Sequence, residues 1–219
     1  MKVCTDACLF GAYVANELRS QENNSILDIG CGTGLLSLLL AQKTTAVIDA
    51  VEIDKAAFEQ AKENFSASPW AAKINIQHTD VLHFEPQKKY DHIISNPPFF
   101  ENDLRSFDDK KNFAKHDTSL TLENLLEVID KYLIDTGSFS VLLPFHRSEY
   151  FEAAAAKLYF HLAKKISVKQ TPKHNFFRSI LIFSKKETPA VKEEITIKNK
   201  DGNYSIEFIE LLKDYYLYL

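Results

Sequence analysis

The sequence lacks any long hydrophobic run: nowhere in its 219 residues do apolar residues approach the roughly 18 in succession that a membrane-spanning helix needs. The apolar stretch near the N-terminus is short and includes Asp6, which is unlike a secretory signal. We therefore expect no membrane partner and a cytoplasmic location. Hydrophobic and charged fractions of 45% and 26% are those of an ordinary globular protein, long enough for one domain with a substantial core.

Cysteine is scarce, with three residues at positions 4, 8 and 31. An odd number confined to one end of the chain argues against a disulfide framework, so we expect reduced thiols. Cys4 and Cys8 could form half of a metal site, but no pair of cysteine or histidine residues follows at ligand spacing, and we expect no metal. The formal net charge is only −4, so a nucleic-acid partner would have to be bound by a local basic patch.

From Ser25 onward, short apolar runs alternate with helical stretches, which is typical of a mostly parallel sheet with helices on both faces. Residues 164–170 and 179–185 follow without a long helix between them and predict an antiparallel hairpin at the sheet edge. The fold class predicted is therefore α/β, with a Rossmann-like, seven-stranded sheet. Its parallel strands are expected at 25–31, 46–53, 74–79, 90–95 and 138–144, and its helices at 35–43, 55–65, 120–133 and 148–160.

We expect a single domain over residues 1–219, with an N-terminal segment (1–24), a core of sheet and helices (25–185) and a C-terminal strand and helix (186–219). The polar stretch 185–194 predicts a surface linker before that last strand, at 194–199.

Two smaller features concern helix ends and faces. Gly137 predicts the end of the helix that precedes the fifth strand. In the last helix, Ile206, Ile209 and Leu212 share one face, which predicts that the helix packs back on the domain.

A glycine-rich segment, DIGCGTG, lies where the first strand turns into the first helix. Its glycines let the backbone turn tightly and let a ligand approach the main chain. Glu52 ends the second strand about 20 residues farther on, where an acid can hydrogen-bond ribose hydroxyls. The glycines are spaced G-x-G-x-G and follow Asp28, whose charge would repel a phosphate but suits a cofactor with a cationic methionine part.

This spacing resembles that of the class I S-adenosylmethionine-dependent methyltransferases, which implies S-adenosylmethionine as the cofactor. By the same resemblance, Asp80 at the end of the third strand would contact the adenine ring; the alternative is that Asp80 only caps a turn. The cofactor residues expected in this part of the chain are Asp28, Gly30, Gly32, Gly34, Glu52, Ile53 and Asp80.

The segment NPPF, residues 96–99, follows the strand 90–95 directly. Prolines cannot extend a strand ladder, so the chain leaves the sheet at its carboxyl edge, where α/β sheets bind ligands. NPPF resembles the signature of methyltransferases that act on amino groups of nucleobases or glutamine side chains. Asn96 Oδ1 and the Pro97 carbonyl can each accept an N–H from an amine, and a base can stack on Phe99. We expect Asn96, Pro97, Pro98 and Phe99 to be catalytic, with Asn96 also beside the cofactor; a plain proline turn is the alternative.

Segments along the whole chain resemble one bacterial family, the tRNA1(Val) adenine-N(6) methyltransferases. The segments are KVCTD near the start, DIGCGTGLLSLLLAQ, DAVEID, SPWAAKINI, ISNPPFF and the final DGNYSIEFIELLKDYYLYL. The resemblance implies methyl transfer to the exocyclic 6-amino group of an adenine in tRNA, adenosine 37 beside the anticodon, and places Thr5 and Asp6 near the methionine end of the cofactor. Family members usually carry a further segment upstream, rich in Phe and Lys, which the resemblance implies would belong to the RNA-binding edge. We expect tRNA as the partner and a monomer.

Three alternatives keep the cofactor pocket and change the substrate: rRNA guanine, DNA adenine or a protein glutamine. A fourth is a noncatalytic RNA-binding module. We expect two basic segments to contact RNA. The first is a loop that is long for the connection of a strand to a helix, and the alternative is that its charged residues only face solvent. The first holds Arg105, Lys110, Lys111 and Lys115; the second holds Lys164, Lys165, Lys169, Lys173 and Arg178 with Phe176 and Phe177.

Overall fold

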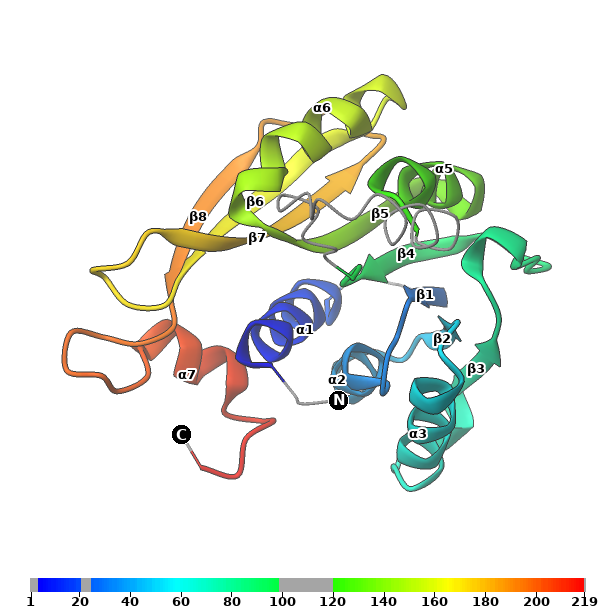
Figure 1. Ribbon diagram of the computed structural model, residues 1–219, viewed down its shortest axis with the longest axis horizontal. Helices are drawn as coiled ribbons and strands as arrows, with labels where there is room; N and C mark the ends of the chain where they lie inside the picture. Colours follow the sequence, from blue (N-terminus) through cyan, green and yellow to red (C-terminus); the bar gives the residue numbers. More distant parts are fainter. Residues whose placement is uncertain (1–3, 21–24, 99–119, 219) are drawn as a thin grey trace, which may run out of the picture.

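The fold is an eight-stranded sheet with helices on both faces, seen in a computed structural model that describes residues 4–20, 25–98 and 120–218 (Figure 1). The strand order is β3-β2-β1-β4-β5-β7-β6-β8. β7 runs antiparallel to both of its neighbours, and the other neighbouring pairs are parallel. The strands are β1 (Ser25–Ile29), β2 (Val47–Glu52), β3 (Ile74–His78), β4 (Tyr90–Ser95), β5 (Leu133–Pro144), β6 (His161–Lys169), β7 (Phe176–Ser184) and β8 (Val191–Thr196).

The helices form two layers. α1 (Thr5–Leu18), α2 (Leu35–Lys43), α3 (Lys55–Ser66) and α7 (Ile206–Leu212) share one hydrophobic cluster with the sheet, and α5 (Leu122–Tyr132) and α6 (Ser148–Lys157) share the other. In Figure 1, α1, α2 and α7 lie on one side of the sheet and α5 and α6 on the opposite side. Short 3-10 turns follow at η1 (Ala71–Lys73), η2 (Val81–His83) and η3 (Phe145–Arg147).

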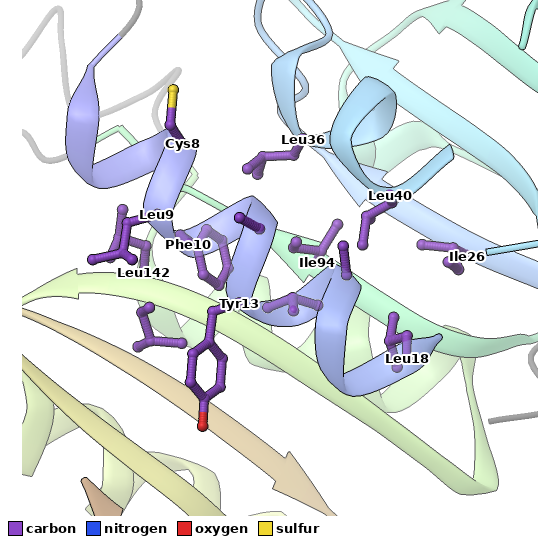
Figure 2. Close-up of a cluster of buried hydrophobic side chains, with 14 of the residues drawn as sticks. Cys8, Leu9, Phe10, Tyr13, Leu18, Ile26, Leu36, Leu40, Ile94 and Leu142 are labelled. Atoms are coloured by element: carbon purple, nitrogen blue, oxygen red, sulfur yellow. The ribbon is translucent and has the colours of Figure 1, made fainter. Parts of the chain in front are cut away.

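The core under α1 is built from side chains that have lost all contact with solvent. Leu9, Phe10 and Val14 of α1 are 0% exposed and pack against Ile94 and Leu142 of the sheet (Figure 2). Burial of this apolar face supplies the main stabilisation of the helix, as for most helices in proteins. Residues 1–24 were expected as an N-terminal segment, with no helix predicted in it, and α1 is therefore an element that the sequence patterns did not predict.

The sheet has eight strands rather than the seven expected, because the C-terminal strand joins it. β8 pairs in parallel with β6, with Val191 opposite Lys164 and Ile195 opposite Val168. The β6–β7 hairpin therefore lies inside the sheet, covered by β8, and not at its edge. The expected linker is also shorter than 185–194, since β8 begins at Val191. As an edge strand with one solvated face, β8 is rich in Lys and Glu, which made its first half resemble a linker.

The final helix packs on the domain as expected, with Leu212 of the expected face buried and Ile209 half-buried; only Ile206 of that face was placed wrongly. Ile206 is 77% exposed, whereas Phe208 and Leu212 are fully buried. Ser205 caps the helix by accepting a hydrogen bond from the Phe208 amide at 3.1 Å, and the ring of Tyr204 stacks on that of Phe208 with centroids 4.6 Å apart. The i, i+4 pair of Phe208 and Leu212 sets the buried face.

Gly137 does not end the preceding helix, since α5 stops at Tyr132 and Gly137 lies within β5. A Cβ at this position would approach the Asp91 carbonyl to 2.8 Å. The missing side chain therefore lets β5 lie close to β4. Among the described residues, no helix has the length and hydropathy required to cross a bilayer.

Candidate active site

The strand order reverses between β1 and β4, which is the position where open α/β sheets bind ligands, outside the carboxyl ends of the strands. Ile29 pairs with Ser95, so the residues that follow them, Gly30 and Asn96, leave the sheet side by side. The Ser95 hydroxyl donates to the Ile29 carbonyl at 2.9 Å and fixes this register. The glycine-rich segment and the NPPF segment thus meet at one edge of the sheet.

Gly30, Gly32 and Gly34 all have positive φ, at 68°, 58° and 87°. No described heavy atom lies within 4 Å of the position that a Cβ on Gly30 would take, so the loop borders open space there. At Gly34 the opposite holds, because a Cβ would lie 2.3 Å from the Phe65 ring of α3. Gly30 therefore leaves room for a ligand, whereas Gly34 is required by packing.

Glu52 links the glycine loop to the end of β2. Its buried carboxylate accepts the Gly32 amide at 2.7 Å through Oε2 and the Asp54 amide at 2.8 Å through Oε1. A carboxylate oxygen can accept more than one hydrogen bond, so ribose hydroxyls can still be bound at this position. Ile53 follows Glu52 and is 55% exposed at the same edge.

Asp28 is fully buried beneath the loop. Its Oδ2 accepts the amide and the hydroxyl of Ser37 at 3.1 and 2.6 Å, while Oδ1 has no hydrogen-bond partner within the part of the chain that the structure describes. Burial raises the pKa of Asp28 to about 7, against the opposing effect of the Ser37 hydrogen bonds. A buried carboxylate with an unpartnered oxygen suits a cationic ligand.

Asp28 should give the free protein a distinctive pH dependence. Between its ordinary pKa of 3.8 and about 7, the folded state keeps a proton that the unfolded state releases, so the free energy of unfolding falls as pH rises. We expect Asp28→Asn to lack this fall. Urea unfolding of both proteins from pH 4 to pH 8 measures the difference, and parallel curves would contradict a raised pKa at Asp28.

Asp80 follows β3 and caps the short η2 turn. Its Oδ1 accepts the Leu82 amide at 2.9 Å, and its Oδ2 lies 3.8 Å from Nδ1 of His83. The residue before it contacts the end of β2, since the Thr79 amide donates to the Glu52 carbonyl at 3.0 Å. The structure thus contains the capping contact, and an adenine contact of Asp80 stays a prediction.

Asn96 is half-buried, and its Oδ1 is buried without a hydrogen-bond partner among the described residues. Buried amide oxygens are rarely left unpaired, which marks this atom as an acceptor for a ligand. Alternation along β4 places Asn96 on the same face as Ile94, the face under α1. Pro97 is buried and Pro98 exposed, while Phe99 lies outside the described residues.

Thr5 and Asp6 form the first turn of α1. Asp6 accepts the Ala7 amide at 3.0 Å through Oδ1 and Nε of Arg178 at 2.8 Å through Oδ2. Arg178 was expected to contact RNA, and its ion pair with Asp6 was not predicted. No local sequence pattern could reveal it, because the two residues lie 172 positions apart.

The second basic segment is largely ion-paired. Lys164 binds Glu17 at 2.7 Å, Lys165 binds Glu152 at 2.7 Å, and Lys169 binds Glu194 at 3.2 Å. Phe176 stacks on Phe145 with ring centroids 5.0 Å apart, and Nζ of Lys169 lies 4.1 Å from the centre of the Phe176 ring. RNA phosphates would therefore compete with carboxylates for these lysines. The first basic segment, 101–119, has no described residue.

No disulfide joins any of the three cysteines, all of which lie in the described part of the chain; Cys4 is exposed, and Cys8 and Cys31 are buried. Burial raises the pKa of the Cys8 thiol, which keeps it protonated. No cluster of three or more histidine, cysteine or acidic side chains suited to a metal occurs in residues 4–20, 25–98 and 120–218.

Comparison with known proteins identifies relatives along almost the whole chain. The methyltransferase small domain family matches residues 11–141. A tRNA1(Val) (adenine(37)-N6)-methyltransferase of Dyadobacter fermentans is 43% identical over 222 residues, which cover 99% of this chain and 91% of that protein. The protein of the same name from Flavobacterium johnsoniae is 39% identical and covers 99% of this chain and 93% of its own length.

Among solved structures, a predicted O-methyltransferase, protein Atu636 from Agrobacterium tumefaciens, matches with a TM-score of 0.70 and 16% identity, covering 94% of this chain and 95% of that one. This likeness confirms the methyltransferase fold. The sequence identities of 43% and 39% over nearly complete chains confirm the resemblance read from the motifs. The chain belongs to the tRNA1(Val) (adenine(37)-N6)-methyltransferase family.

Proposed function

We propose that this chain transfers a methyl group from S-adenosylmethionine to the 6-amino group of an adenine in tRNA, adenosine 37 of tRNA1(Val). The observation that carries the proposal is the buried, unpartnered amide oxygen of Asn96 beside the open glycine loop at the switch point of the sheet. The names of the relatives supply the RNA and the base.

The residues around the loop fit the cofactor. Gly30 leaves space for close approach, Asp28 offers an unpartnered carboxylate oxygen to a cation, and Glu52 ends β2 with acceptors for ribose hydroxyls. Under the proposal the cofactor is held by these residues with Thr5, Asp6, Gly32, Gly34, Ile53 and Asp80.

Bound S-adenosylmethionine supplies an electrophilic methyl group on a sulfonium. The protein's task is to orient the amine, whose lone pair is delocalised into the purine ring. Asn96 Oδ1 and the Pro97 carbonyl each accept one N–H, which holds the lone pair toward the methyl group. Positive charge grows on the nitrogen during transfer, so both acceptors bind the transition state more strongly than the neutral amine, and the methylated nitrogen then loses one N–H proton to water. Pro97 and Pro98 restrict the loop that carries these acceptors.

Asn96 Oδ1 and the Pro97 carbonyl could orient the amino group of any planar amine, so this geometry does not distinguish adenine from the alternative substrates. Membership of the family favours tRNA adenine over rRNA guanine, DNA adenine and protein glutamine. We further propose that the chain acts as a monomer in the cytoplasm.

The test is transfer of tritium from labelled S-adenosylmethionine to unmodified tRNA1(Val), followed by nucleoside analysis. We expect labelled N(6)-methyladenosine, and no label in a transcript that carries guanosine at position 37. Label in rRNA, DNA or protein instead would overturn the proposed substrate. Cofactor binding without transfer to any of these acceptors would favour the noncatalytic module.

A further inference from the structure

An ion pair joins the first turn of α1 to β7 at the edge of the proposed cofactor site. Nε of Arg178 donates to Oδ2 of Asp6 at 2.8 Å, and the two side chains are 27% and 17% exposed. The remaining carboxylate oxygen of Asp6 accepts the Ala7 amide. Both oxygens of the carboxylate are therefore held in place before any ligand binds.

The direction of β7 explains why Arg178 lies at this edge. Because β7 runs antiparallel to β5, its first residues lie beside the last residues of β5, with Arg178 opposite Pro144. Alternation puts Arg178 on the same face as Ile180 and Ile182, which belong to the cluster under α1. Asn96 leaves the sheet on this face two strands away, at about 10 Å in the direction across the strands.

The first turn of α1 also lies beside the helix that follows the glycine loop. α1 and α2 share one hydrophobic cluster, and a Cβ on Gly11 of α1 would lie 2.5 Å from Leu39 and 3.1 Å from Leu36 of α2. Because Arg178 lies opposite Pro144, the last residue of β5, the Asp6 carboxylate that it binds stands at the carboxyl edge of the sheet, where β4 also ends before Asn96.

Arg178 was expected to contact RNA, but its guanidinium is occupied within the protein. Besides the bond to Asp6, Nη1 donates to the Phe177 carbonyl at 3.3 Å, and the guanidinium lies 5.5 Å from the centre of the Phe177 ring. These contacts fix the plane of the Arg178 guanidinium group.

We propose that Arg178 is a positioning residue for the cofactor: it holds the Asp6 carboxylate toward the methionine end of S-adenosylmethionine. The inference rests on the proposed function. The methionine end of S-adenosylmethionine carries an ammonium and a carboxylate, and the Asp6–Arg178 pair carries one charge of each sign, so the net electrostatic attraction between them is small. The affinity for the cofactor then depends on the direction in which the Asp6 carboxylate points. A carboxylate that is already fixed loses little side-chain entropy on binding.

The experiment measures the Kd of S-adenosylmethionine by calorimetry without RNA, and the Kd of tRNA by filter binding over a range of salt concentrations. Arg178→Gln should raise the Kd of the cofactor about tenfold, the effect of one charge-assisted hydrogen bond, and leave tRNA affinity and its salt dependence unchanged. The cofactor Kd of Arg178→Lys should lie between those of Arg178→Gln and the wild type, because lysine keeps the positive charge but lacks the planar guanidinium group. Lys186→Gln, the same loss of charge at an exposed residue two positions beyond the opposite end of β7, should leave the cofactor Kd unchanged.

A double-mutant cycle isolates the coupling. Asp6→Asn combined with Arg178→Gln should bind the cofactor no more weakly than Asp6→Asn alone, since Arg178 acts through Asp6. Additive losses would overturn the inference, as would an unchanged cofactor Kd in Arg178→Gln. A raised tRNA Kd with a shallower salt dependence would assign Arg178 to RNA instead. Thermal unfolding checks each variant, and Arg178→Lys carries the test if Arg178→Gln does not fold. A wild type that bound no cofactor would overturn the proposed function itself.

Discussion

Asn96→Ala should lower kcat by about 100- to 1000-fold and leave the Kd of S-adenosylmethionine within about twofold of the wild-type value. The variant loses the buried Oδ1 acceptor, which has no partner among the described residues and which we propose binds the amine. An acceptor that binds developing charge acts on the transition state, so turnover falls while cofactor affinity persists. Single-turnover methylation of tRNA, with calorimetry of the cofactor on the same preparation, measures both quantities.

Asn75→Ala is a suitable control for this prediction. It removes an exposed amide on β3 that donates to Asp49 at 2.8 Å, so it changes the same chemical group away from the NPPF segment. Turnover in this variant should match the wild type. If Asn96→Ala lost cofactor binding to the same degree as turnover, the side chain would be a cofactor ligand and its assigned role in orienting the amine would be wrong.

Alanine at Gly34 should destabilise the fold by about 2–5 kcal/mol, the largest stability effect that we expect from one methyl group. The backbone φ of 87° is costly for any residue with a Cβ, and that Cβ would lie 2.3 Å from the ring of Phe65. Phe65 is 3% exposed and packed in the core, so it has little room to move aside. Urea unfolding at constant pH measures the change.

Substitutions at Gly30 and Gly202 separate the cost of backbone strain from the clash with a core side chain and from the loss of space for the cofactor. Both have positive φ, and no described heavy atom lies within 4 Å of the position that a Cβ would take on either residue, so alanine should cost each about 1–2 kcal/mol of stability. Gly30→Ala should also raise the cofactor Kd about 10- to 100-fold, because the methyl group enters the space left for the ligand. Gly202→Ala, in an exposed turn, should not. Equal cofactor affinity in Gly30→Ala and Gly202→Ala would contradict a cofactor at the glycine loop.

The predictable part of the structure depends on patterns that are local in the sequence. The run YDHIIS predicts a strand at 90–95, and β4 has these bounds; LLSLLLAQK likewise predicts α2 over 35–43. The meeting of Gly30 and Asn96 also follows from general rules, since parallel strands end at one edge of the sheet and ligands bind where the strand order reverses.

The misplaced elements depend on contacts between distant segments. β8 could not be assigned to the sheet because its pairing partner, β6, decides its position and its exposed face carries charges. Ile206 was expected to be buried from helical periodicity, but the packing of Phe208 beside Tyr204 rotates the helix away from that face. The ion pair of Asp6 with Arg178 was missed for the same reason, since the two residues lie 172 positions apart and no pattern within either segment predicts their contact.

The packing of α1 has a consequence for synthesis on the ribosome. α1 emerges first, yet many of its partners come from the end of the chain: Arg178 binds Asp6, Glu193 accepts the hydroxyl of Tyr13 at 2.9 Å, and α7 packs against α1. At about 5–20 residues per second, α7 follows α1 after roughly 10 to 40 seconds. α2 is available early, and Ile94 and Leu142 of the sheet follow at about the middle of synthesis, but the part of α1 that contacts β7 and α7 stays uncovered until translation is nearly complete. A chain released before β7 should therefore require chaperone protection and should lack the ion pair that holds the Asp6 carboxylate.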